Sequence, residues 1–217
     1  GKFDFFSYPG HTLPRAIVAG GRYKGGSFQG IVAEATRLGI EVREHVMVTD
    51  LLRDGSTVCG AVALEIDREG LLILEAKAVI MATGGAGYLF SLTTNLPGIT
   101  GDGCALAYDA GAILSDMEFV QMRACMIHPA PMRGTAPPAD GGVTIGGRFY
   151  NGLCERYMKK YHSEKAEQVT RAEVARCTQK EILEGRSSPH GGVYGDFSGV
   201  PREQLAKFKA FMQSCTA

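Results

Sequence analysis

The chain has 217 residues, and 45% of them are hydrophobic, so it is long and apolar enough to build a folded core. Lysine plus arginine and aspartate plus glutamate number 23 each, and no block of like charge occurs. Because a nucleic-acid-binding surface needs a basic excess, nucleic acid is excluded as an expected partner. The longest apolar stretches are too short to span a bilayer.

Cysteine usage predicts no metal centre. The six cysteines lie at positions 59, 104, 125, 154, 177 and 215, and no two have the close spacing of a zinc or iron–sulfur motif. We expect buried thiols in a reducing compartment, and the metal-site prediction is none.

The first half of the chain predicts a helix followed by strands. Apolar residues recur at helical spacing over 27–38, and Gly39 is a natural stop. Strands are expected at 40–43 and 45–52, and a hairpin at 57–66 and 71–76, joined by the loop 67–70.

The middle of the chain predicts a strand and a helix separated by glycine-rich turns. The continuous apolar run 78–82 is typical of a buried parallel strand. Residues 102–110 favour a helix with Thr100 or Asp102 near its N-cap.

The last third of the chain differs in composition, because it is rich in proline at its start. Prolines mark an irregular segment from about residue 122, and helices are expected at 151–161 and 171–183. Pro201 is expected to open a last helix.

Two glycine-rich motifs carry chemical information. The apolar run ends in Thr83-Gly84-Gly85, which lets the backbone turn sharply beside a flat or phosphorylated ligand. Gly101 and Asp102 lie in a Thr-Gly-Asp-Gly motif that opens a helix, where a carboxylate can accept hydroxyl protons from a ribityl chain or a ribose. Taken singly, an ordinary βα turn and an ordinary N-cap aspartate are the alternatives.

Taken together and in order, these motifs resemble the succinate dehydrogenase/fumarate reductase flavoprotein family, which includes L-aspartate oxidase. The resemblance runs through VIMATGGAGYLF, ITGDGCALAYDAGAILSDMEFVQ, Ile127-His128-Pro129, CERYMKKY, VTRAEVARC and EILEGR. It implies an α/β fold, α+β overall. Residues 1–121 would be part of a Rossmann-like FAD-binding domain, and 122–217 a fumarate-reductase-type capping domain truncated at its C-terminal end.

The resemblance also assigns roles to individual residues. Asp102 inherits the contact to FAD, with Thr83, Gly84, Gly85 and Gly101 beside it. His128 takes the place of the histidine that binds the substrate carboxylate. The alternative for His128 is a loop imidazole bonded to the backbone.

The proton-delivery residues are also implied by the resemblance. Arg171 matches the arginine that protonates the substrate carbon, and Asp140 can stand in for the relay glutamate. Val143 occupies the place of the relay arginine and cannot carry a proton. The alternative for Arg171 is a solvated charge on a helix surface.

The implied reaction is hydride exchange between FAD and a dicarboxylate. Because Val143 departs from the family pattern, a family member with another substrate stays open, such as L-aspartate oxidase or another unsaturated-acid reductase. A non-catalytic interaction module is the alternative of a different class. The implied partners are a small dicarboxylate substrate and an iron–sulfur electron-transfer subunit, and the implied location is the cytoplasm, either free or at the inner face of the membrane through partner subunits.

The chain lacks a recognisable dinucleotide fingerprint. Residues 21–26 read GRYKGG, which differs from GxGxxG and follows no predicted strand. We therefore expect an internal piece of a flavoprotein that is inactive alone and binds FAD weakly or not at all. Exposed sheet edge and apolar surface are expected to favour self-association.

Overall fold

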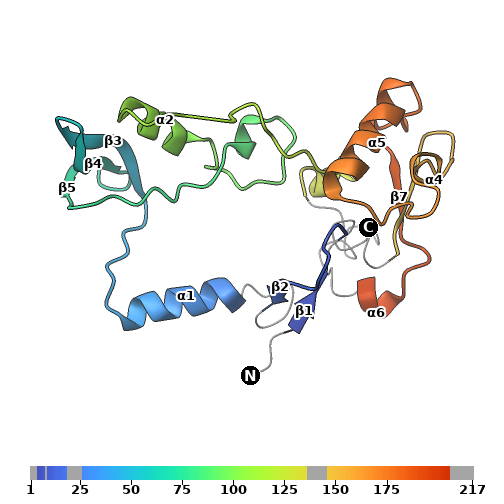
Figure 1. The fold of residues 1–217 in the computed structure, drawn as a ribbon, viewed down its shortest axis with the longest axis horizontal. Coiled ribbons are helices and arrows are strands. Elements are labelled where there is room, and N and C mark those ends of the chain that lie inside the picture. The colour runs from blue at the N-terminus through green and yellow to red at the C-terminus, as the bar shows by residue number, and fades with distance from the viewer. Residues whose placement is uncertain (1–3, 8, 19–25, 136–145, 206–217) are drawn as a thin grey trace. The chain divides into compact units, whose positions relative to one another are not determined.

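The computed structural model describes residues 4–7, 9–18, 26–135 and 146–205 (Figure 1). The chain divides into two compact units. Ala33–Val120 form one, here called the central unit, and Gly1–Val32 together with Gln121–Ala217 form the other, the terminal unit. The functional division into an FAD domain, 1–121, and a capping domain, 122–217, stays a prediction.

The central unit contains a three-stranded antiparallel sheet with the order β3-β4-β5 (Figure 1). Its strands are β3 (Val46–Asp54), β4 (Thr57–Glu65) and β5 (Gly70–Glu75). This confirms the predicted hairpin of β4 and β5, in which Ala63 pairs with Leu72. Gly60 allows the close approach of β5, because a Cβ there would lie 2.1 Å from the Leu74 carbonyl oxygen.

Two predicted strands of the central unit are wrong. Residues 40–43 and 78–82 have no strand structure, and Ile80 is 91% exposed rather than buried. A parallel strand needs a neighbour to pair its backbone N–H and C=O groups. In the described part of the chain all strand pairs are antiparallel, and none of the paired strands includes 78–82.

The helices of the first half agree with the sequence. Helix α1 (Gly26–Arg37) ends just before Gly39, whose φ of 68° is the left-handed conformation expected after a helix. Helix α2 (Asp102–Asp109) also forms, but its N-cap residue is Gly101, with a φ of 83°, rather than Thr100 or Asp102. The short 3-10 helix η1 (Gly87–Leu89) precedes it.

The terminal unit combines two short antiparallel strand pairs with helices. The pairs are β1 (Asp4–Phe6) with β2 (Ala16–Val18), and β6 (Arg148–Tyr150) with β7 (Tyr194–Asp196). The helices are η2 (Ala130–Met132), α4 (Met158–Tyr161), α5 (Arg171–Leu183) and α6 (Arg202–Leu205). The last of these confirms a helix after Pro201 for its described turn.

Helix α5 forms as predicted, whereas the helix predicted over 151–161 is reduced to α4. The N-cap Thr170 of α5 accepts a hydrogen bond from the Glu173 N–H at 3.4 Å. Before α4, the Asn151 side-chain oxygen instead accepts bonds from the N–H groups of Leu153 and Glu155, each at 3.0 Å. This side chain offers the backbone an alternative to the helix, which explains the shorter element.

A compact core joins these elements in the terminal unit. The buried members of this core are Phe149, Tyr157, Met158, Ala166, Val174 and Cys177. A fully buried carboxylate, Glu181, lies beside it and receives hydrogen bonds from Arg186, Asn151, Tyr161 and Lys160. Burial and the bond to this carboxylate raise the pKa of Tyr161 to about 12.

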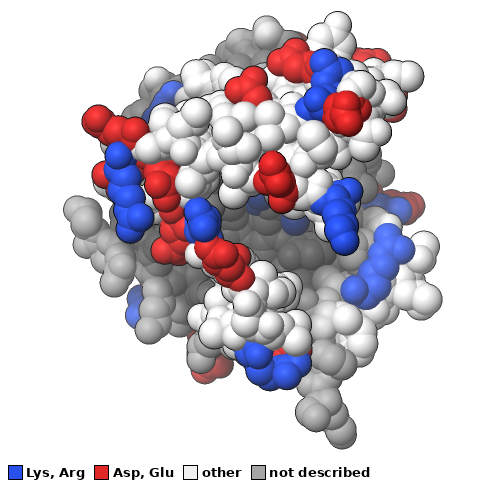
Figure 2. Space-filling view, turned by 90° about the vertical axis from the view of Figure 1, so that its left-hand side faces the viewer, with Lys and Arg blue, Asp and Glu red and all other residues white. Residues whose placement is uncertain are grey.

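Charges of both signs are interspersed on the face drawn in Figure 2, which fits the equal numbers of basic and acidic residues. Within the described ranges, no helix combines the length and the apolar character that a membrane span requires.

Candidate functional site

The structure brings the two glycine-rich motifs of the central unit into direct contact. A Cβ on Gly103, in the first turn of α2, would lie 1.9 Å from the Thr83 hydroxyl oxygen. A Cβ on Gly101 would lie 2.9 Å from the Ala86 Cβ. Only glycine at these positions lets the 83–86 turn lie against the start of α2.

Local hydrogen bonds fix the turn and the helix start. The Tyr88 N–H donates to the Ile99 carbonyl at 2.9 Å, which ties η1 to the segment before α2. The Thr100 hydroxyl donates to the Asp102 carboxylate, and the left-handed backbone of Gly101 turns the chain into the helix. As a result, Thr83, Gly84, Gly85, Gly101 and Asp102 are gathered in one place.

This arrangement fits the requirements of FAD. Residues 83–85 are exposed, and a Cβ on Gly85 would meet no atom within 4 Å, so their backbone presents an open surface to a flat ring or a phosphate. The first N–H groups of α2 carry partial positive charge, and the exposed Asp102 carboxylate can accept hydroxyl protons. These residues would hold the cofactor through backbone contacts and one carboxylate.

In the terminal unit, His128 stacks on a second histidine. The rings of His128 and His190 lie with their centroids 4.0 Å apart and their planes inclined by 8°. Both side chains are exposed at the surface. The peptide bond between His128 and Pro129 is cis.

Two loops hold this histidine pair. A Cβ on Gly192 would lie 2.5 Å from the Ile127 Cδ1, so the two loops approach closely at a glycine. The Ser188 N–H donates to the Gly192 carbonyl at 2.6 Å and closes the loop that carries His190. The paired imidazoles therefore sit on ordered backbone.

Positive charge lies in the loop that leads to His128. Burial raises the pKa of the Cys125 thiol, and the guanidinium groups of Arg123 and Arg133 act on the same thiol in the opposite direction. Two arginines and two imidazoles in these loops make the region suitable for an anion such as a carboxylate.

Of the two predicted proton-delivery residues, Arg171 lies within the described part of the structure and Asp140 does not. Arg171 is the first residue of α5, directly after the N-cap Thr170, and it is exposed. Asp140 and Val143 lie outside the described residues. Of these residues, the structure therefore locates only Arg171, and its role in proton delivery stays a prediction.

Sequence reasoning missed two groupings. His190 lies 62 positions beyond His128, and only its position before the glycine pair Gly191-Gly192 hinted at a tight loop. His162, Glu173 and Cys177 also come together, although cysteine spacing predicted no metal site. Pairings between distant loops are not visible in local patterns.

Comparison with known proteins gives relatives that include a fumarate reductase subunit and an L-aspartate oxidase. The chain is 36% identical over 210 residues to one subunit of the fumarate reductase (CoM/CoB) of Methanothermobacter marburgensis, covering 94% of this chain and 37% of that protein. It is 34% identical over 212 residues to the L-aspartate oxidase of Caulobacter vibrioides, covering 94% of this chain and 40% of that protein. The chain therefore spans less than half the length of these relatives.

The fold also matches a solved reductase. The structure aligns with a quinol-fumarate reductase solved with menaquinol molecules at a TM-score of 0.81 and 26% identity, covering 94% of this chain and 37% of that chain. This confirms the expected mixed α/β fold of the succinate dehydrogenase/fumarate reductase flavoproteins. A family model described as the FAD binding domain matches residues 12–216. The chain therefore belongs to the FAD binding domain family.

Proposed function

We propose that this chain provides the flavin-contacting turn and the substrate-binding loops of an oxidoreductase that exchanges hydride between FAD and a dicarboxylate. The observation that carries the proposal is the packing of Thr83 on Gly103, which joins the two glycine-rich motifs into one open surface. Fumarate reductase and L-aspartate oxidase among the relatives support a dicarboxylate substrate.

In this proposal, residues of the central unit bind FAD and set its orientation. The bound flavin supplies the hydride chemistry, which is a property of the cofactor. The exposed backbone at Gly84 and Gly85, with open space at the Cβ position of Gly85, would lie against a flat ring, and the Asp102 carboxylate would accept hydrogen bonds from hydroxyl groups. These contacts fix the position of the cofactor.

The residues of the terminal unit act on the substrate. In the proposal, His128 donates a hydrogen bond to a substrate carboxylate, and the stacked ring of His190 holds its imidazole in place. Arg171 delivers the proton to the substrate carbon. Because a guanidinium has a pKa above about 12, this transfer needs a relay that returns the proton, and Asp140 is the residue proposed for it.

A glycine substitution tests the flavin surface. Gly85→Ala adds a methyl group where no protein atom lies within 4 Å, so the fold is unaffected but the proposed flavin surface is filled. We expect Gly85→Ala to weaken FAD binding about tenfold or more in a fluorescence titration, whereas Gly199→Ala, also in open space, leaves it unchanged. Equal affinities for both variants would refute this surface.

Substitution of the histidines tests the substrate loops. In the complete FAD-loaded flavoprotein, His128→Ala is expected to raise the KM for fumarate, and His190→Ala to raise it less because its ring acts through His128. The control is His45→Ala, which changes an exposed histidine of the central unit and is measured by the same steady-state kinetics. Unchanged KM for His128→Ala would remove it from the site.

A second substrate within the same family is favoured by one sequence feature. Val143 stands where the resemblance places the relay arginine, and a 34% identical relative is an L-aspartate oxidase. Turnover of L-aspartate without reduction of fumarate would select this alternative. An iron–sulfur electron-transfer subunit is the proposed partner. Stable folding without flavin together with a defined protein partner of another kind would favour the interaction module instead.

A further inference from the structure

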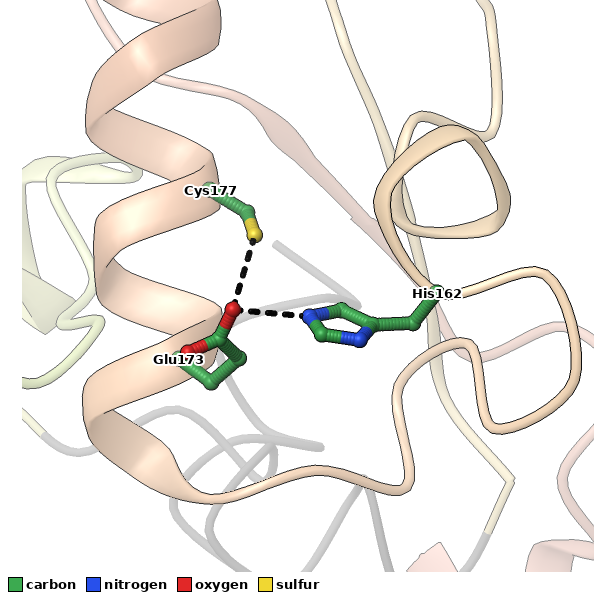
Figure 3. Close-up of side chains that lie close together, drawn as sticks. All are labelled: His162, Glu173 and Cys177. Carbon is green, nitrogen blue, oxygen red and sulfur yellow. Dashed lines mark hydrogen bonds and ion pairs between the residues drawn. The ribbon is translucent and has the colours of Figure 1, made fainter.

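His162, Glu173 and Cys177 form a compact cluster in the terminal unit (Figure 3). The Glu173 Oε1 lies 2.8 Å from the His162 Nε2 and 3.9 Å from the Cys177 Sγ. All three potential ligand atoms lie within 4.8 Å of one another. The cluster thus offers one nitrogen, one oxygen and one sulfur to a single point.

Secondary structure holds these groups in place. Glu173 and Cys177 are four residues apart on α5 and therefore share one face of the helix (Figure 3). His162 is the C-cap residue of α4, and its N–H donates to the Met158 carbonyl at 2.8 Å. Met158 and Cys177 both belong to the buried core, so the helix and the α4 turn are anchored to each other.

The two carboxylate oxygens of Glu173 have different partners, and only one of them faces the cluster. Arg176 pairs with the Oε2 of Glu173, while the Oε1 faces the histidine and the cysteine. Cys177 is buried, whereas the side chains of His162 and Glu173 are 28% and 23% exposed. This partial exposure leaves a side of the cluster open to a cation and a water molecule.

We propose that His162, Glu173 and Cys177 bind a divalent transition metal ion of the zinc type. Tetrahedral zinc has Zn–N and Zn–O distances of about 2.0–2.2 Å and Zn–S of about 2.3 Å, which places ligand atoms roughly 3.3–3.6 Å apart. The observed 2.8 and 3.9 Å lie on either side of this range, and the separation of the His162 nitrogen from the Cys177 sulfur is no more than 4.8 Å, so side-chain shifts of about 1 Å complete the geometry.

Binding of a metal ion at this cluster would displace the proton of the Cys177 thiol. The acceptor oxygen of Glu173 lies close to the thiol of Cys177 and the ring nitrogen of His162. Zinc binds thiolate and neutral imidazole, so its entry releases the thiol proton and leaves the carboxylate charged. Burial raises the pKa of the Cys177 thiol, with Glu173 acting in the same direction, and a bound dication supplies the charge that offsets both.

The site would clamp the start of α5. It joins Glu173, in the first turn of α5, to the end of α4, and Arg171 is the first residue of the same helix. A metal that binds only the folded form stabilises it by mass action, so the thermal midpoint is expected to rise with metal concentration. Metal binding at these three residues requires neither flavin nor turnover.

Cobalt titration of the reduced, flavin-free chain tests the site, since Co²⁺ reports thiolate ligation through a charge-transfer band. We expect one equivalent of Co²⁺ to produce this band, and Zn²⁺ to remove it. Cys177→Ser should abolish the band, whereas Cys154→Ser, a change at an exposed cysteine outside the cluster, should retain it.

A second variant tests whether loss of the band in Cys177→Ser is caused by unfolding rather than by loss of a ligand. His162→Gln changes a partly exposed side chain, and it is expected to lower the Co²⁺ affinity at least tenfold and to remove the metal-dependent rise in the thermal midpoint. Circular dichroism confirms that the variant is folded. Absence of the band in the parent chain, or its persistence in both Cys177→Ser and His162→Gln, would overturn the proposal.

Discussion

The two units of this protein differ in what stabilises them. The terminal unit packs aromatic and aliphatic side chains around Met158 and places a bonded carboxylate, Glu181, beside them. In the central unit the buried hydrophobic side chains are the alanines of β4, Ala61 and Ala63, while Ile73 of β5 remains 66% exposed. The terminal unit therefore has its own core, and the central unit offers surface that a ligand or another chain segment can cover.

The largest expected effect comes from removing the buried carboxylate. Glu181→Ala leaves Arg186 and Asn151 without their shared partner, and breaking a buried pair costs about 3–5 kcal/mol. Urea unfolding, read by hydrogen exchange of α5, should show this loss in the terminal unit. Glu184→Ala, at an exposed acid that also contacts Arg186, is the control and should change the midpoint much less.

Truncation of one apolar side chain in each unit tests the same difference in stability between the two units. Met158→Ala removes a side chain with 0% exposure, and such substitutions cost about 2–5 kcal/mol. Ile73→Ala in the central unit should cost less than about 0.5 kcal/mol, because the side chain is mostly in solvent. Similar losses for both variants, measured by urea unfolding, would contradict the contrast between the units.

Overpacking probes the tight contact between Thr83 and Gly103 in the central unit. Gly103→Ala places a methyl group 1.9 Å from the Thr83 hydroxyl oxygen, and overpacking of this kind costs about 1–3 kcal/mol. Gly30→Ala in α1 meets no atom within 4 Å and should instead stabilise by about 0.5–1 kcal/mol. Hydrogen exchange of residues 83–88 would detect the local loosening in Gly103→Ala.

The smallest expected effect is a change in the acid profile of stability. The Arg186 guanidinium holds the pKa of Glu181 far below its ordinary value of 4.5, against the opposing effect of burial. The stabilisation from a lowered carboxyl pKa is complete above the unfolded-state value and is lost as the pH falls toward the folded-state value. Unfolding midpoints measured from about pH 6 to about pH 3 should therefore decline less steeply in Glu181→Gln than in the parent chain.

The sequence predicted local elements well where the signal was local. The β4–β5 hairpin followed from alternation and a turn, and α5 followed from its periodicity. The run 78–82 failed as a strand because strand formation depends on a partner that lies elsewhere in the chain. Asn151 shortened the next helix through side-chain bonds that periodicity does not reveal.

The site was predictable to the extent that it lies in contiguous motifs. Thr83 was singled out in the first motif, Gly103 lies in the second motif about twenty residues later, and the structure places the two in contact. The stacking of His128 on His190 and the grouping of Cys177 with His162 depend on loop packing, which the sequence alone does not specify. The roles assigned to Arg171 and Asp140 stay predictions.

The most direct test of the central claim is an FAD titration of the isotope-labelled chain followed by NMR chemical shifts, which detects even weak binding. We predict that the amide signals of Gly84, Gly85, Gly101 and Asp102 shift together with one apparent affinity, while those of β4 stay in place. The contact of Thr83 with Gly103 requires that both motifs respond as one surface. Shifts confined to other segments, or no shift at either motif at saturating FAD, would contradict the account.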